Sequence, residues 1–403
     1  MWTSLLLISA SYASPVVVGV GEAVPLGLQG RHARPFIAAD GGLHLGYGRA
    51  GSFRVVPIGE DGLPVLDADR VLVAGDGRFV DHTFVPCGGG TFLHVASGRT
   101  DRPDDTAWAT PVGADLVPGS IRTIVQSSES LATNDLAAVC EGPVVGVGLA
   151  GAGEPGGPLP PDWFAVLHDG FFAGEPIETL VDVSDAARMT GSSMRWDDGA
   201  GALRIYGMQP DLGLVVASYD DTLAPLGVDT AWPLIPADQY PYWPQGLAVS
   251  GRGTLLAHMV RGDADGFAQD TGQVAVTVLD PDLMPVETWQ LTELAAPDGA
   301  MRPDLVLTGP DAAFVTFDVS GRIWAVQLEL DADALASLGS EPEQDTGLPD
   351  SGGPGGSGTD GTDPGRLRRK GDGRAGGCSV NPAGGGLLLL LLGLSARRRA
   401  GLR

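Results

Sequence analysis

Histidine is the first residue type in this sequence with catalytic and metal-binding potential. There are six, and none of them shows the His-x-x-His or His-Glu-x-x-His spacing of zinc sites: His32, His44, His82, His94, His168 and His258. Three of them, His44, His94 and His258, fall in the second strand of a predicted hairpin. If those strands surround a common axis, these histidines form either a metal-binding ring or a set of hydrogen-bonded structural residues, and we expect the structural role.

An acidic segment offers oxygen ligands for calcium. It reads Asp263-Ala-Asp265-Gly266 and continues to Asp270. Carboxylates suit Ca²⁺, but an EF-type loop also needs a third ligand before its glycine and a terminal glutamate, which this segment lacks. The segment is therefore either a weak calcium site or a solvated acidic loop, and we predict no other cofactor.

A cluster of aromatic residues offers a stacking surface. Trp232, Tyr240, Tyr242 and Trp243 lie among four prolines between residues 230 and 245. Aromatic faces held rigid by proline suit stacking on sugars or peptides, because little rotamer entropy is lost on binding. The alternative is that these rings cover the hydrophobic core of the fold.

The elements that position these residues form a repeat. Tight glycine-containing hairpins recur, and each is followed by an acidic turn that begins at Asp61, Asp115, Asp169, Asp220, Asp280 or Asp331. The turns are spaced 54, 54, 51, 60 and 51 residues apart. A unit of about 50 residues with two hairpins is a four-stranded blade, and radial repetition of blades gives a β-propeller.

We therefore predict an all-β, six-bladed β-propeller over residues 15–335. The sixth unit lacks an outer strand, and the apolar segments Val16–Val20 and Val24–Leu28 belong to no other unit. Pairing of this N-terminal strand with the last blade would close the ring and remove an open sheet edge. The alternative architecture is a pair of β-sandwich domains. In a propeller, the longest loops, 98–107, 150–162 and 262–272, would share one face with residues 230–245.

Composition and charge exclude other classes. The chain has 403 residues, of which 61 are glycine and 31 proline, which leaves little room for long helices and excludes a helical bundle. The formal net charge is −25. Such a chain repels phosphate backbones, so we expect no nucleic-acid partner.

The two ends of the chain are predicted to direct export rather than to fold. Residues 1–13 are apolar and end in small residues, which is typical of a signal peptide, although no positive charge precedes the apolar stretch and a buried first strand is the alternative. Residues 341–375 are rich in Gly, Pro, Ser, Thr and Asp and are predicted to be a disordered linker. A short leucine-rich helix, within residues 376–403, precedes a final arginine cluster.

The order of these C-terminal parts resembles the MYXO-CTERM class of bacterial sorting signals. The resemblance covers about residues 376–401: Gly377-Cys378-Ser379, the leucine run and Arg397-Arg398-Arg399. It implies a membrane anchor, a sorting protease as partner, and Cys378 as the processing or lipid-attachment residue. It also implies that the body lies outside the cytoplasm, at the bacterial cell surface, in the outer membrane or in the extracellular space. A plain C-terminal membrane helix is the alternative.

Two cysteines remain for the body. Cys87 and Cys140 occupy matching positions in neighbouring repeats. An oxidising compartment would allow a disulfide between them if their Cα atoms lie within about 7 Å. The alternative is two buried free thiols.

These features favour a binding or interaction module for an extracellular glycan, peptide or protein, because aromatic and acidic loops are present without an assembled acid, base and nucleophile. The alternative is an extracellular hydrolase or lyase. It would draw histidines and carboxylates from different blades into the propeller channel, and sequence spacing does not reveal such a site.

Overall fold

The structure is a computed structural model of the whole chain. It describes residues 15–98, 106–126, 136–150, 162–166, 179–182, 193–209, 213–230, 242–249, 253–260, 272–294 and 298–338. Residues 1–344 form one compact unit and residues 345–403 another, and all described residues lie in the first. Among the described residues, no helix is long and apolar enough to cross a membrane.

The described residues form six antiparallel sheets, numbered here in chain order. The first contains β3 (Arg31–Ile37), β4 (Leu43–Arg49), β5 (Ser52–Pro57) and β6 (Arg70–Val73). The second contains β7 (Asp81–Pro86), β8 (Phe92–Gly98), β9 (Thr106–Val112) and β10 (Arg122–Gln126). The third contains β11 (Leu136–Val139), β12 (Gly146–Ala150), β13 (Asp162–Val166) and β14 (Thr179–Asp182).

The remaining sheets follow the same order of strands. The fourth contains β15 (Ser193–Asp197), β16 (Ala202–Gln209), β17 (Gly213–Tyr219) and β18 (Pro225–Thr230). The fifth contains β19 (Tyr242–Val249), β20 (Gly253–Val260), β21 (Gln273–Leu279) and β22 (Pro285–Gln290). The sixth contains β23 (Ala300–Gly309), β24 (Ala312–Val319), β25 (Arg322–Leu330), β1 (Val17–Val20) and β2 (Val24–Gln29).

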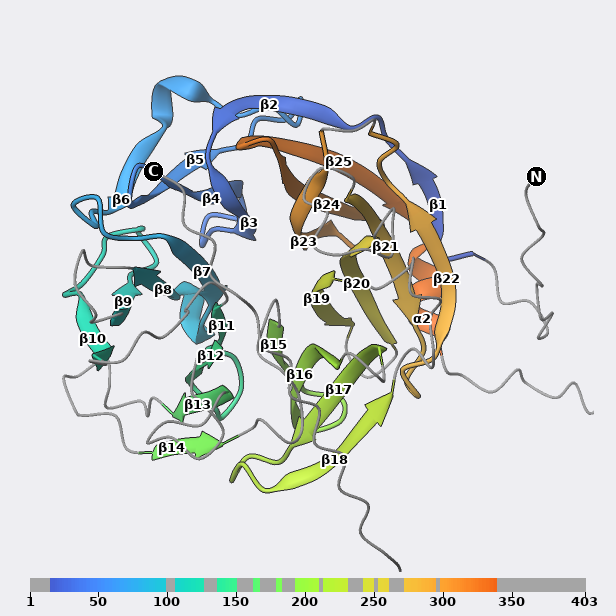
Figure 1. The fold of residues 1–403 in the computed structure, drawn as a ribbon. Coiled ribbons are helices and arrows are strands. Elements are labelled where there is room, and N and C mark those ends of the chain that lie inside the picture. Colours follow the sequence, from blue (N-terminus) through green and yellow to red (C-terminus); the bar gives the residue numbers. More distant parts are fainter. Residues whose placement is uncertain are drawn as a thin grey trace, which may run out of the picture. The chain divides into compact units, whose positions relative to one another are not determined.

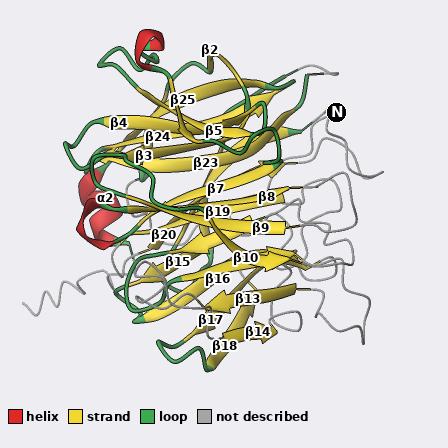
Figure 2. Ribbon diagram, turned by 90° about the vertical axis from the view of Figure 1, so that its left-hand side faces the viewer, coloured by secondary structure: helices red, strands yellow, loops and turns green. Residues whose placement is uncertain are grey.

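The sheets are arranged around a centre as a β-propeller. Figure 1 shows the first strands β3, β7, β11, β15, β19 and β23 nearest the middle. These strands contact one another in cyclic order, and β23 contacts β3. Figure 2, turned by 90°, shows the strands of successive sheets stacked along the molecule, with the short helix α2 (Ala332–Ser337) near one end of the strands.

The hydrophobic core lies between neighbouring sheets. Six buried clusters each join two consecutive sheets, and the cluster between the sixth and first sheets completes the cycle. Phe36, Phe84 and Phe92, for example, pack together between the first and second sheets. Every sheet therefore buries both faces, which is the packing of a propeller and not of two separate β-sandwiches.

The N-terminal segment supplies the outer strands of the sixth sheet. β1 pairs with β25 through Val17 and Leu330, and β2 pairs with β25 through Val24 and Ala325. The first part of the described chain therefore hydrogen-bonds to the last strand, which covers an edge that would otherwise be open.

The acidic turns have one conformation in four of the sheets. In each, an aspartate carboxylate accepts a backbone N–H two or more residues later, as Asp61 accepts from Leu63. The turns begin at Gly59, Gly113, Asp220 and Asp280, whose carbonyls each accept the N–H of the residue three places later. That later residue, the fourth of the turn, has a positive φ and is Gly62, Leu116, Leu223 or Leu283. Leu116 and Leu283 are buried, so packing compensates for the strain of a left-handed leucine. The repeated sequence signal thus corresponds to a repeated turn.

Candidate functional site

Three of the first strands carry the same irregularity at their N-terminal ends. Arg31 pairs with Gly48 and Arg34 with Gly46, so three steps on β3 match two on β4, which defines a β-bulge. The same count occurs on β19 from Tyr242 to Gln245 and on β23 from Met301 to Asp304. The residues one place into these bulges are His32, Trp243 and Arg302.

The bulges change where the side chains point. His32 and Arg302 both have a positive φ, of 53° and 52°, although neither is glycine. A bulge bends the strand and aims a side chain that regular pleating would send elsewhere. Arg302 donates a 2.9 Å hydrogen bond to Asp318 on the neighbouring strand β24.

His32 pairs with an aspartate of the next sheet. Its Nδ1 lies 2.7 Å from Oδ1 of Asp81, the first residue of β7, and both side chains are almost fully buried. The same carboxylate oxygen accepts a 2.7 Å hydrogen bond from the backbone N–H of His82. This contact therefore joins the first and second sheets at the N-terminal ends of their inner strands.

Burial shifts both partners toward their neutral forms. Desolvation, followed by the charge of Arg302, holds the pKa of His32 well below its usual 6.5. Desolvation also raises the pKa of Asp81 from 3.8 to about 6, against the opposing charge of Arg34. Above pH 6 the pair is thus a neutral imidazole whose Nδ1–H donates to a carboxylate. His32 Nε2 is left as a hydrogen-bond acceptor.

A second histidine pair lies beside the first. His82 Nδ1 is 3.1 Å from Nε2 of His94 on β8, and His94 Nδ1 is buried without a partner. An unpaired acceptor nitrogen costs less than an unpaired N–H, so we assign the His94 proton to Nε2, which donates to His82. His82 then carries its own proton on Nε2. Desolvation lowers the pKa of His82 to about 3, which keeps it neutral.

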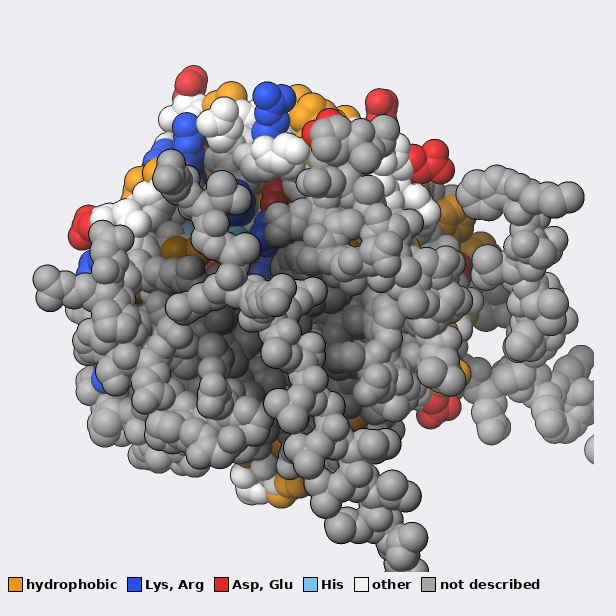
Figure 3. Space-filling model, viewed as in Figure 1, with side chains coloured by type: hydrophobic (Ala, Val, Ile, Leu, Met, Phe, Trp, Pro, Cys, Tyr) orange, Lys and Arg blue, Asp and Glu red, His pale blue; other side chains and the backbone are white. Residues whose placement is uncertain are grey.

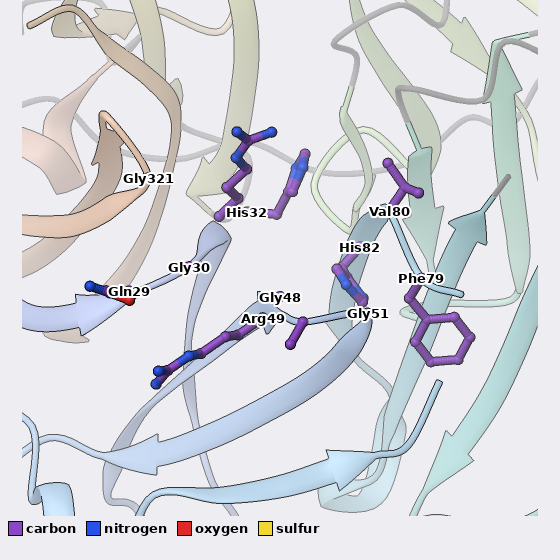
Figure 4. A pocket seen from close by; sticks show the side chains of 12 residues that line it. Gln29, Gly30, His32, Gly48, Arg49, Gly51, Phe79, Val80, His82 and Gly321 are labelled. Carbon is purple, nitrogen blue, oxygen red and sulfur yellow. The ribbon is translucent and has the colours of Figure 1, made fainter. Parts of the chain in front are cut away.

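His32 and His82 border a cavity of about 240 Å³ (Figure 4). Its polar lining consists of Gln29, Arg31, His32, Arg49 and His82. The rest of the lining comes from the glycine-containing turns of the first and sixth sheets, from Gly30, and from Phe79 and Val80 before β7. In Figure 3, arginine and histidine side chains are visible in blue and pale blue near the middle of the face viewed in Figure 1.

The cavity is positively charged on an acidic protein. Arg31 and Arg49 are exposed, and no carboxylate is among the lining residues that the structure describes. It lies at the end of the sheets where β3 begins and the β4–β5 and β24–β25 turns fall. These turns consist of two residues with positive φ, Ala50-Gly51 and Ser320-Gly321, as in type I′ hairpins.

The three second-strand histidines do not lie at equivalent positions. His44, His94 and His258 lie on β4, β8 and β20, but two, three and five residues beyond the last residue of their hairpin turns, so their registers differ. His44 contacts the Gly42 carbonyl and stacks on Phe36. His258 is buried and bonds to Thr277 on β21, which is the structural role we expected for it.

Only some of the predicted aromatic and calcium-binding residues lie within the described part of the chain. Trp232 and Tyr240 lie outside the described residues, as do Asp263, Asp265 and Asp270. Tyr242 and Trp243 belong to strand β19 rather than to a connecting loop, which corrects the boundary. The strand continues past Pro244 because that proline sits in the bulge, where no ladder hydrogen bond is lost. Within the described residues no group of three or more His, Cys, Asp or Glu side chains is arranged to hold a metal.

Cys87 and Cys140 form a disulfide with a Cα–Cα distance of 4.6 Å. Each follows directly after the inner strand of its sheet, β7 or β11, so the bond joins the second and third sheets. Cys378 lies outside the described residues.

Five residues of the candidate site were not predicted from the sequence: Arg31, His32, Arg49, Asp81 and His82. One signal was available for His32: the strands with bulges read Arg31-His-Ala-Arg34, Tyr242-Trp-Pro-Gln245 and Met301-Arg-Pro-Asp304. In each, a large side chain precedes a small residue or a proline and then a hydrogen-bonding residue. The pairing of His32 with Asp81 has no such signal, because the two residues lie in different repeats.

Among the comparisons with known proteins, one solved structure shows a similar overall fold. No family model matches the chain, and no curated protein matches it. A protein of unknown function from Dyadobacter fermentans resembles it with a TM-score of 0.54 and 12% identity, over 78% of this chain and 100% of that one. A GH43 protein from Bacillus licheniformis has a TM-score of 0.41 and 11% identity, over 76% of this chain and 54% of that one. A GH43_1 enzyme from Xanthomonas citri has a TM-score of 0.40 and 13% identity, over 69% and 98%.

Proposed function

We propose that this protein is an exported, cell-surface-anchored β-propeller with six blades that acts as a binding module for an extracellular ligand. The single observation that carries the binding function is the cavity bordered by His32, His82, Arg31 and Arg49. It is open, and its lining combines basic and neutral hydrogen-bonding groups. Binding sites favour such concave places where a few polar groups converge.

The blade number follows from the cyclic packing. Each of the six sheets contacts the next through its first strand and through one hydrophobic cluster. We propose that each sheet is one blade and that β1 and β2 close the sixth.

Export and anchoring are argued from the ends of the chain and from the disulfide. A disulfide between Cys87 and Cys140 is stable in an oxidising compartment and rare in a reducing one. The apolar residues 1–13, the linker 341–375 and the segment 376–403 with Cys378 would then act as signal, stalk and anchor. Trp232, Tyr240, Tyr242 and Trp243 would add a stacking surface for a glycan or peptide, and Asp263, Asp265 and Asp270 a weak calcium site.

The anchor is tested with Cys378→Ala in the native host. We expect the variant to lose surface retention and to appear in the medium or with an unprocessed tail. Ser357→Ala is the matched control, because it is a similarly small change in the linker and leaves both Cys378 and the Cys87–Cys140 disulfide intact. Unchanged surface retention and normal tail processing in Cys378→Ala would contradict the anchor.

The binding site is tested by placing a negative charge in the cavity. Val80 lines it and is 51% exposed, whereas Val117 is 57% exposed and lies in the β9–β10 turn at the other end of the strands. Retention of the full chain on immobilised extracellular polysaccharide should fall at least about tenfold for Val80→Glu and stay unchanged for Val117→Glu. Equal retention by both variants would exclude the cavity as the site.

A second candidate is an extracellular hydrolase or lyase, and one observation favours it. The Asp81 carboxylate fixes the tautomer of His32 and leaves Nε2 free to take a proton, as in general-base catalysis. Turnover of acidic polysaccharides by the wild type, abolished in His32→Asn, would support the enzyme. Binding without turnover would support the module.

A further inference from the structure

We propose that the cavity takes a hydroxy acid, such as a uronic acid residue of an extracellular polysaccharide, with its carboxylate against Arg31 or Arg49 and a hydroxyl against His32 Nε2. This inference rests on the proposed binding function and names the class of its ligand. It is argued from the charge, the hydrogen-bonding character and the size of the cavity.

Charge selects an anion. Arg31 and Arg49 are exposed and line the cavity, and no carboxylate is among its described lining residues. Three nearby carboxylates are paired, Asp81 with His32, Asp304 with Arg34 and Asp318 with Arg302, and Asp298 accepts a hydrogen bond from Ser320 in the β24–β25 turn. Figure 4 shows Arg49 extending away from His32 and His82, so a ligand carboxylate would meet one guanidinium group, which can bind it in a two-pronged geometry.

The buried histidines add two neutral groups of opposite character. His32 is 92% buried and presents Nε2 as an acceptor, because Asp81 holds its Nδ1–H. His82 carries its proton on Nε2, because His94 donates to its Nδ1. Gly48 has no Cβ, and the His82 ring fills the space that one would occupy. A ligand with only acceptor oxygens would leave His32 Nε2 unpaired, whereas a hydroxyl beside the anion satisfies it.

Size restricts the ligand to a small group. The cavity volume of about 240 Å³ is below the usual range of about 300–1,000 Å³ for drug-sized ligands. A single sugar ring or one chain end suits this volume. The cavity is open, so a polymer could extend beyond the bound ring.

The test is calorimetric titration of the full chain, kept in detergent, with galacturonate. Galactose serves as the neutral counterpart of galacturonate, and sulfate and inorganic phosphate serve as inorganic anions without a sugar ring. We expect galacturonate to bind at least about tenfold more tightly than galactose and more tightly than sulfate or phosphate. Equal affinity for galactose and galacturonate, or tighter binding of phosphate or sulfate, would overturn the proposal.

Variants separate the two parts of the site. Of Arg31→Gln and Arg49→Gln, the one that removes the guanidinium group at the carboxylate should weaken galacturonate binding about tenfold, and the lysine variant at that position should recover part of the loss because it keeps the charge without the planar fork. Arg70→Gln, on the outer strand of the same sheet and outside the cavity, is the control and should bind like the wild type. Unchanged affinity in both Arg31→Gln and Arg49→Gln would overturn the proposal.

His32→Asn tests the hydroxyl contact. Asparagine tolerates a positive φ, so the backbone of the bulge should be kept. We expect about tenfold weaker galacturonate binding and unchanged weak binding of sulfate, which has no donor for Nε2. Equal losses for both ligands would contradict the hydroxyl contact.

The two proposals fail in different ways. If the Val80→Glu variant is no longer retained on polysaccharide but galacturonate binds no better than galactose, the cavity is a binding site and the proposed ligand class is wrong. If the Val80→Glu variant is retained on polysaccharide as well as the wild type and galacturonate does not bind, the proposed function of the cavity is wrong as well.

Discussion

His32 of the first sheet lies 2.7 Å from Asp81 of the second, and this contact sets both the tautomer of the histidine and the packing of the two inner strands. Because Asp81 also accepts the His82 backbone N–H, it holds both cavity histidines from one carboxylate oxygen. The electrostatics of the candidate site therefore depend on Asp81, which does not line the cavity.

Asp81→Asn is expected to change the tautomer of His32 while keeping the fold. An asparagine at this position still accepts the backbone N–H of His82, but it removes the anion that selects the Nδ1–H tautomer of His32. We expect a mixture of tautomers in the ¹⁵N NMR spectrum of His32 and about tenfold weaker galacturonate binding. A single unchanged tautomer together with unchanged affinity would show that Asp81 does not position His32.

An ion pair between the first and sixth sheets should be important for closing the ring of sheets. Arg34 on β3 lies 3.3 Å from Asp304 on β23, both side chains are nearly buried, and Arg34 also donates to the His82 carbonyl. Asp304→Ala leaves a buried guanidinium without its carboxylate and should lower the free energy of unfolding by about 3 kcal/mol.

The double variant Arg34→Met/Asp304→Leu should lose less than Asp304→Ala, because it leaves no unpaired buried charge. Asp69→Ala is the control, since its partner Arg54 is more exposed, with 24% of its side chain accessible. Denaturant unfolding measures all three. A loss for Asp304→Ala no larger than that for Asp69→Ala would contradict the closing role.

Loss of the disulfide should destabilise the fold strongly. The bond closes a loop between residues that are 53 positions apart, and chain-entropy estimates give about 4 kcal/mol for such a loop. Cys87→Ser/Cys140→Ser should therefore unfold at a much lower denaturant midpoint than the wild type. Reduced wild type should match the double variant, and equal midpoints for oxidised and reduced wild type would contradict the prediction.

The stability of the fifth sheet should depend on pH through His258. Burial lowers its pKa from 6.5 to about 4, so between these values the unfolded chain binds a proton that the folded chain does not. The free energy of unfolding should therefore decrease as the pH falls from about 6.5 to about 4, by about 3 kcal/mol from this residue.

His258→Gln isolates this contribution. The variant cannot take up the proton, so its stability should depend less steeply on pH over the same range than that of the wild type. Denaturant unfolding at several pH values gives both slopes, and the contributions of the other buried groups cancel in their difference. Parallel slopes would show that His258 titrates alike in both states.

The architecture was predictable because local signals repeat. The acidic turns that start near Asp61, Asp115, Asp220 and Asp280 recur at blade spacing, and four of them have one hydrogen-bond pattern. The ends of the strands around the long loops also agree with expectation, since β8 ends at Gly98 and β12 at Ala150. Turn chemistry is local, so the sequence carries it directly.

The candidate site was not predictable because it depends on contacts between repeats. His32 and Asp81 are brought together by the packing of two sheets, and a β-bulge turns His32 toward that contact. A one-residue bulge changes the face of a strand on which a side chain lies, and regular alternation gives no sign of it. A bulge also lets strand β19 continue through Pro244, so Tyr242 and Trp243 lie in a strand rather than in a loop.

The most direct test of the cavity is a crystal structure of the full chain soaked with galacturonate. We predict density for one sugar ring in the cavity, with its carboxylate within about 3 Å of Arg31 or Arg49 and a hydroxyl at hydrogen-bond distance from His32 Nε2. An empty cavity, with galacturonate bound at another place or not at all, would contradict the account.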